Sequence, residues 1–220
     1  MKKMFVSAIM VLISLSLTGC GSSGSSASDL FFTQILSDPT YDGDIKVPLA
    51  LTDPIIITQG MGSVQSVFAG IDPTTQAEYR AFLDFPLTGV GGVPGDAVIV
   101  SARLNIVIKS IQPQAGTIPI RIELVYFQPP TLIPTDFDLG IQPALAITTN
   151  VPPISQADVG YNVSVDVTSL MAEAQRLGLP DFQIRILEDL SAVSLGLIEI
   201  NDTTGAHRGD FAPLLKVTYN

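Results

Sequence analysis

Apolar and polar side chains alternate one by one along several segments of this sequence. Residues 79–85 are the clearest case, and residues 97–111 and 118–127 repeat the same period of two. Successive side chains of a β-strand point to opposite faces of a sheet, so this period predicts strands with one buried face. We therefore expect long, half-buried strands in the middle of the chain.

Eight shorter apolar runs, separated by turn-forming residues, are also typical of strands. They are residues 30–36, 55–58, 64–70, 144–148, 161–166, 182–187, 193–200 and 214–219. Residues 169–177 carry apolar side chains at helical spacing, with Thr168 as the expected N-cap and Gly178 as the stop. The sequence thus predicts one all-β domain over residues 30–220, a β-sandwich with one short helix.

The first twenty residues read as a lipoprotein export signal. Lys2 and Lys3 precede an apolar stretch, residues 4–17, that is shorter than the roughly 20 residues needed to cross a bilayer. Residues 17–20, Leu-Thr-Gly-Cys, resemble the lipobox of bacterial lipoproteins. This resemblance implies a signal peptide over residues 1–19 and acylation of Cys20, with residues 20–29 as a flexible Gly/Ser tether. Gly21 favours, by analogy, the outer membrane, facing either the periplasm or the outside.

Composition and charge restrict the partners and the chemistry. The formal net charge of −10 disfavours nucleic acid as a partner, because the protein's field repels phosphate backbones. Cys20 is the only cysteine, and a lipid on its sulfur would leave no disulfide, zinc–thiolate site or cysteine nucleophile. The single histidine, His207, lies in a predicted surface loop without a nucleophile elbow. We therefore expect no enzyme activity and no cofactor, apart from the calcium ion considered below.

Four segments resemble DNRLRE-type domains. They are residues 79–87 (YRAFLDFPL), 95–104 (GDAVIVSARL), 165–168 (VDVT) and 213–219 (PLLKVTY). The resemblance covers roughly residues 64–219 and implies a jelly-roll β-sandwich of the kind grouped with carbohydrate-binding modules. This chain has no Trp, so any aromatic surface for sugars must come from Tyr or Phe.

Two polar positions within the matching segments have a structural interpretation. Arg80 shares a strand face with Asp84, and we expect charge-assisted bonds there to hold a sheet edge or an adjacent loop. Asp166 precedes the predicted helix, where its carboxylate would accept backbone N–H groups.

Two groups of residues are candidates for binding. Asp38, Asp42 and Asp44 lie in a Gly-containing acidic stretch that could supply oxygen ligands to Ca²⁺, although acidic turns are also common in secreted β proteins. The aromatic residues in or near predicted loops are candidates for ligand contact, or else cover the core. They are Tyr41, Tyr126, Phe127 and Tyr161.

These features favour a lipid-anchored, non-catalytic binding protein of the bacterial envelope or surface, which contacts polysaccharide or protein through the loops of a β-sandwich. The alternative is a structural or accessory subunit of an envelope assembly, joined to its neighbour through an exposed strand edge. A hydrolase ranks below both, because no pair of the chain's acidic residues stands out as catalytic.

Overall fold

The computed structural model describes residues 29–50, 52–60, 62, 65–113, 116–127, 131–189 and 195–220. The predicted signal peptide, the predicted acylation site Cys20 and nearly all of the predicted tether lie outside the described residues. Within these ranges, no helix is long and apolar enough to cross a membrane.

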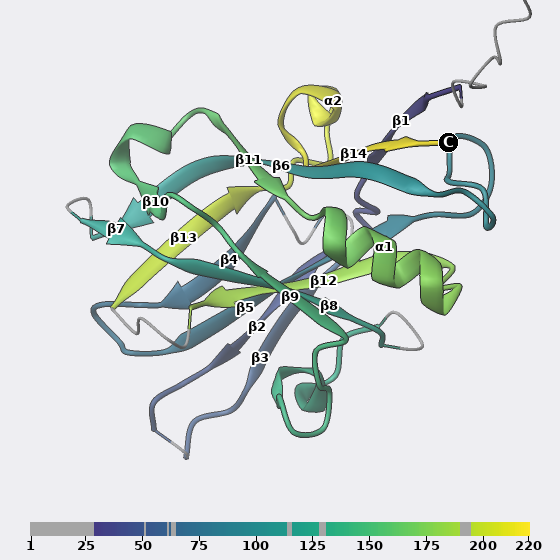
Figure 1. Ribbon diagram of the computed structural model, residues 1–220. Helices are drawn as coiled ribbons and strands as arrows, with labels where there is room; N and C mark the ends of the chain where they lie inside the picture. Colours follow the sequence, from purple (N-terminus) through teal and green to yellow (C-terminus); the bar gives the residue numbers. More distant parts are fainter. Residues whose placement is uncertain are drawn as a thin grey trace, which may run out of the picture.

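The all-β sandwich expected from the sequence is confirmed (Figure 1). The strands of the described chain are β1 (Phe31–Leu36), β2 (Gly43–Val47), β3 (Ile56–Gln59), β4 (Ser66–Ile71), β5 (Glu78–Pro86), β6 (Ile99–Gln112), β7 (Thr117–Ile118), β8 (Ile120–Val125), β9 (Ala146–Thr149), β10 (Ile154–Ser155), β11 (Asn162–Asp166), β12 (Asp181–Glu188), β13 (Gly196–Asn201) and β14 (Leu214–Tyr219). The helices are α1 (Thr168–Leu177) and α2 (Arg208–Phe211), with 3-10 turns at Pro134–Phe137 and Gln156–Asp158.

Twelve of the described strands form one curled antiparallel sheet that folds over itself into two layers, and β7 and β10 pair in a separate two-stranded sheet. In the first layer, which we call the first sheet, β14 lies between β1 and the first half of β6, and β11 pairs with β6 on its other side. The second sheet has the order β3-β2-β5-β12-β8-β9. The second half of β6 pairs with β13, which pairs with β4 and so reaches β5. The long strand β6 therefore joins the two layers.

The main core lies between the layers and is apolar. On β5, Ala81, Leu83 and Phe85 belong to it, as the alternation in this segment predicted. Helix α1 adds Leu170 and Met171, both fully buried. A continuous apolar interior of this size accounts for a fold that has no disulfide among its described residues.

Helix α1 forms where it was predicted, but its start differs in detail. Thr168 is the first helical residue rather than the N-cap, a position that Val167 occupies without a side-chain bond. Asp166 Oδ1 accepts the Thr168 N–H at 2.9 Å, as expected, and hydrogen bonding to Thr168 lowers the pKa of Asp166. Gly178 ends the helix in the left-handed conformation, with a φ of 65°.

The outer face of the second sheet is also covered, by a segment that we call the covering segment (residues 126–127 and 131–145). Phe127 and Leu132 of this segment pack on Ile45, Phe82 and Val125 in a second, smaller apolar cluster. The only regular element in the described part of this segment is the 3-10 turn Pro134–Phe137. The central strands of the second sheet, β5, β12 and β8, are therefore buried on both faces along most of their length.

Candidate functional site

A groove opens between the β2–β3 hairpin and strands β4, β5 and β13. Two adjoining hollows, about 460 and 570 Å³, form it, and Lys46 and Ile56 line both. A binding cleft is typically concave and largely apolar with a few polar groups, and this groove has that composition. We call it the ligand groove.

Aromatic rings and a cation meet in the first half of the ligand groove. The rings of Tyr79 (β5) and Phe68 (β4) lie 5.8 Å apart at an angle of 53°. The Lys46 Nζ lies 5.5 Å from the centroid of the Tyr79 ring, within the range of a cation–π contact. The Tyr79 ring is therefore positioned by contacts with both Phe68 and Lys46.

Asp44 of β2 is a buried carboxyl group in the same half of the groove. Its Oδ2 accepts the backbone N–H of Phe68 at 3.3 Å. Burial raises the pKa of Asp44 to about 7, and the Phe68 N–H opposes this shift. Asp44 thus changes between hydrogen-bond donor and acceptor near neutral pH.

Glu199 of β13 is the second carboxylate of the groove. Its oxygens accept hydrogen bonds from Ser66 Oγ at 2.8 Å and Ser110 Oγ at 2.7 Å, and Lys109 Nζ lies 2.8 Å away. Burial alone would raise the pKa of Glu199, but the bonds from Lys109, Ser110 and Ser66 together lower it. Glu199 is therefore a fixed anion beside the aromatic pair.

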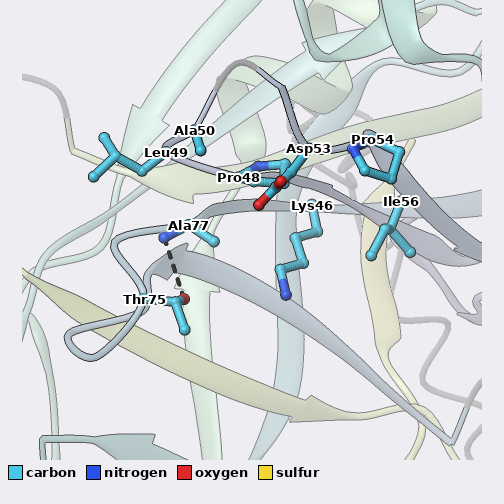
Figure 2. Close-up of a pocket in the computed structure, with 9 residues that line it drawn as sticks. All are labelled: Lys46, Pro48, Leu49, Ala50, Asp53, Pro54, Ile56, Thr75 and Ala77. Carbon is cyan, nitrogen blue, oxygen red and sulfur yellow. Dashed lines mark hydrogen bonds between the residues drawn. The ribbon is translucent and has the colours of Figure 1, made fainter.

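The other half of the ligand groove is mainly apolar (Figure 2). Its lining includes Pro48, Leu49, Pro54 and Ala77, with the Lys46 side chain extending toward Thr75. The wall that carries Thr75 is fixed, because the Asp72 carboxylate accepts the Thr74 N–H at 2.7 Å and the Thr75 hydroxyl at 2.8 Å.

Gly43 allows β2 and β3 to approach closely at the end of the hairpin that lies away from its loop. A Cβ on this residue would lie 2.3 Å from the carbonyl oxygen of Thr58 on β3. Only glycine fits this approach of the two backbones. The hairpin that walls the groove therefore depends on Gly43.

The three aspartates proposed for calcium bind different partners. Asp38 Oδ1 accepts the Thr40 N–H in a turn, Asp42 Oδ1 accepts the Asp84 N–H, and Asp44 bonds Phe68. In the described ranges, no three His, Cys, Asp or Glu residues gather in a way that could hold a metal ion. Asp44 lies in strand β2 and Asp42 directly precedes it, so reading this stretch as an acidic loop was wrong from residue 43 onward.

The predicted loop aromatics do not gather at one site. Phe127 is only 3% exposed and packs edge-on against Phe82, so it belongs to the smaller core. Tyr161 is 69% exposed, Tyr126 is also exposed, and Tyr41 is half-buried. Neither hollow of the ligand groove has any of these four side chains in its lining.

A buried charged cluster lies at the other end of β2. Arg208 Nη1 donates to Asp202 Oδ1 at 3.1 Å, and its Nη2 lies 3.6 Å from Asp42 Oδ2. Arg208 also bonds the Ser37 carbonyl and so attaches the α2 loop to the β1–β2 connection. Burial and then the neighbouring Asp202 raise the pKa of Asp42 well above its usual value. This cluster therefore joins the α2 loop to the β1–β2 connection, and we assign it a structural role.

Of the aromatic and charged residues of the ligand groove, sequence reasoning singled out only Asp44, and it did so as a calcium ligand. Tyr79 and Phe68 sit in strands, and Tyr79 falls on the apolar face of β5, where alternation assigns it to the core. Lys46 and Asp44 at alternate positions of residues 43–47 were the available signal, because they give this short strand a polar face. Pairing between distant strands, which the local pattern does not contain, brings these residues together.

Comparison with known proteins identifies no relative. No protein-family model matches the chain, and no curated protein is similar to it. The resemblance to DNRLRE-type domains therefore stays a prediction.

Proposed function

We propose that this protein is a lipid-anchored, non-catalytic binding protein of the bacterial envelope and that the ligand groove holds a polysaccharide. The observation that carries the proposal is the Phe68–Tyr79 aromatic pair, which lies among hydrogen-bonding side chains in an open groove. The lipid anchor rests on the lipobox-like residues 17–20.

A sugar chain suits this surface for a physical reason. One face of a pyranose ring presents C–H groups, which favour contact with an aromatic face, while its hydroxyls need polar partners around the rim. The groove supplies such partners in Asp44, Thr58, Gln65 and Glu199. Because the groove consists of two adjoining hollows, it has room for a chain longer than one sugar.

The test is a glycan array, together with isolated envelope polysaccharides, probed with residues 20–220 carrying Cys20→Ser. This chain contains the whole described fold. We expect binding, and we expect Tyr79→Ala to weaken it by about tenfold or more, the loss expected for one well-placed aromatic contact. The matched control is Tyr161→Ala, which removes an exposed tyrosine outside the groove.

Two outcomes would contradict the proposal. One is the absence of any bound glycan, and the other is equal binding by the Tyr79→Ala and Tyr161→Ala variants.

Each array is run with and without Ca²⁺. Loss of binding when calcium is chelated, reproduced by Asp38→Asn, would support the sequence-based prediction of a calcium ion at Asp38, Asp42 and Asp44.

A second candidate function is that of an accessory subunit, favoured by the edge strand β3. In the described chain β3 pairs only with β2, and its Ile56 is exposed, as is the preceding Ile55. An edge of this kind can pair with a strand of another protein. Crosslinking in intact cells tests it, because an accessory subunit gives one dominant protein adduct and a glycan binder does not require one.

A further inference from the structure

The outer face of the first sheet has an apolar end where the described chain begins. Leu30 and Phe32 are exposed there, and so are Val98 and Val100 near the start of β6. Ile99, between Val98 and Val100, packs against the main core, while Phe31, which is itself 54% exposed, stacks on Tyr219 at 5.8 Å. Phe32, Thr218 and Ser101 form one cross-strand row beside Val100. We call Leu30, Phe32, Val98 and Val100 the apolar end.

Two cations lie on the same face, one step further along the strands. Lys216 of β14 is directly opposite Arg103 of β6, and Gln34 of β1 completes this row. Asp166 lies on the other side of Arg103, where its carboxylate is bonded to the start of α1. Like charges directly opposite one another destabilise a sheet, which is notable in a protein with a net charge of −10. An anionic partner would relieve this repulsion.

The chain itself restricts what can cover this face. Leu30 follows Cys20 by ten positions, and a chain of ten residues reaches at most about 35 Å in any conformation. If Cys20 is acylated, the apolar end is therefore held close to the membrane surface at a high effective concentration. Exposed apolar side chains next to cations are the combination that binds the interface of an anionic bilayer.

We infer that the apolar end, with Lys216 and Arg103, is a membrane-contacting surface that orients the sandwich on the bilayer. Several acyl chains on Cys20 would already anchor the protein stably, and this second contact would fix the orientation of the sandwich on the bilayer. The inference rests on the lipid anchor of the proposed function. Figure 1 shows the start of β1 and the C-terminus at one end of the molecule and the β2–β3 hairpin at the other. This orientation would turn the ligand groove away from the membrane.

The test uses the single cysteine and the absence of Trp in the chain. Residues 20–220 are coupled through Cys20 to a maleimide phospholipid in vesicles of phosphatidylcholine and phosphatidylglycerol. This coupling reproduces the attachment whether or not a cell acylates Cys20, so its result is independent of the proposed function. Phe32→Trp supplies one fluorophore at the apolar end, and Val98→Trp supplies a second position in case the first disturbs β1.

The matched control is Ile141→Trp, because Ile141 is 61% exposed, compared with 58% for Phe32, and lies on the covering segment of the opposite sheet. We expect blue-shifted emission and quenching by brominated lipids for Phe32→Trp and Val98→Trp, but not for Ile141→Trp. Equal quenching at all three positions, or no quenching at any, would overturn the inference. Adding Arg103→Gln and Lys216→Gln should reduce the quenching to its level in pure phosphatidylcholine vesicles, and an unchanged signal would refute the role of the cations.

Discussion

The central strands of the second sheet, β5, β12 and β8, are buried on both faces, but by different chemistry. Its inner face meets the first sheet and α1 through apolar side chains such as Leu83 and Ile184. Its outer face carries Arg185 and Glu123, both with fully buried side chains, beneath the covering segment. Any apolar layer could cover the inner face, whereas the outer face needs a cover with polar groups at specific positions.

The buried arginines of the outer face need hydrogen-bond acceptors in the covering segment. Arg185 Nε donates to Glu123 Oε2 at 2.7 Å, while Nη1 donates to the Asp136 carbonyl at 2.8 Å and Nη2 to the Gln142 carbonyl at 2.9 Å. Arg80 bonds the Phe137 carbonyl and lies over the Phe137 ring. Buried charges must be paired and hydrogen-bonded, so these arginines fix the conformation of the covering segment. Arg80 thus holds an adjacent loop, as the sequence predicted, although its carboxylate partner is Glu78 rather than Asp84.

The largest expected effect comes from breaking the buried pair on the outer face. Glu123→Leu leaves the Arg185 guanidinium buried without a carboxylate, and we expect a loss of about 3–5 kcal/mol in the free energy of unfolding. Urea unfolding followed by circular dichroism measures it. Adding Arg185→Met should restore part of the loss, because an apolar pair needs no charge partner, but the Asp136 and Gln142 carbonyls then lose their donor. If the double variant is no more stable than Glu123→Leu, the pair is not the cause.

A smaller effect, and one that depends on pH, is expected from Asp84 on the outer face. Burial raises the pKa of Asp84 to about 6, against the opposing bond from Gln183 Nε2 at 2.7 Å. The folded state therefore holds this proton more tightly than the unfolded chain. The contribution of Asp84 to stability is full below about pH 4, and it is lost as pH rises through 6, by up to about 1.4 kcal/mol per pH unit.

Asp84→Asn should flatten the dependence of stability on pH between 4 and 7, as measured by urea unfolding at each pH. Other buried carboxyls with raised pKa values, Asp44 and Asp42, titrate in the same direction and leave a residual slope. Leu83→Ala on the inner face is the control, because it lowers stability equally at every pH. A slope that Asp84→Asn leaves unchanged would contradict the assignment.

The smallest effect is expected at the start of α1, the helix that adds to the core at the inner face. Asp166→Ala removes the acceptor of the Thr168 N–H, and we expect a loss of about 1 kcal/mol. Asp166→Asn keeps a side-chain oxygen at this position and should lower stability by only about 0.3 kcal/mol. Thermal unfolding of both variants decides whether the side-chain oxygen, rather than some other property of Asp166, stabilises the helix start.

Local patterns in the sequence determined most of the elements. The alternation in residues 79–85 marks β5, and the spacing of Leu170, Met171 and Ala174 marks α1, because these periods follow directly from backbone geometry. β2 escaped prediction, because its five residues include Asp44 and Lys46 and it becomes a strand through pairing with β3 and β5.

The ligand groove and the buried charges were decided by the tertiary structure alone. Residue 199 lies far along the chain from residues 68 and 79, and the registers of β4, β5 and β13 bring all three to one surface. Arg185 alternates with apolar residues as a solvent-exposed arginine would, and only the covering segment turns its face into an interior. A periodic pattern records which side of a strand each residue is on, but what lies against that side depends on distant parts of the chain.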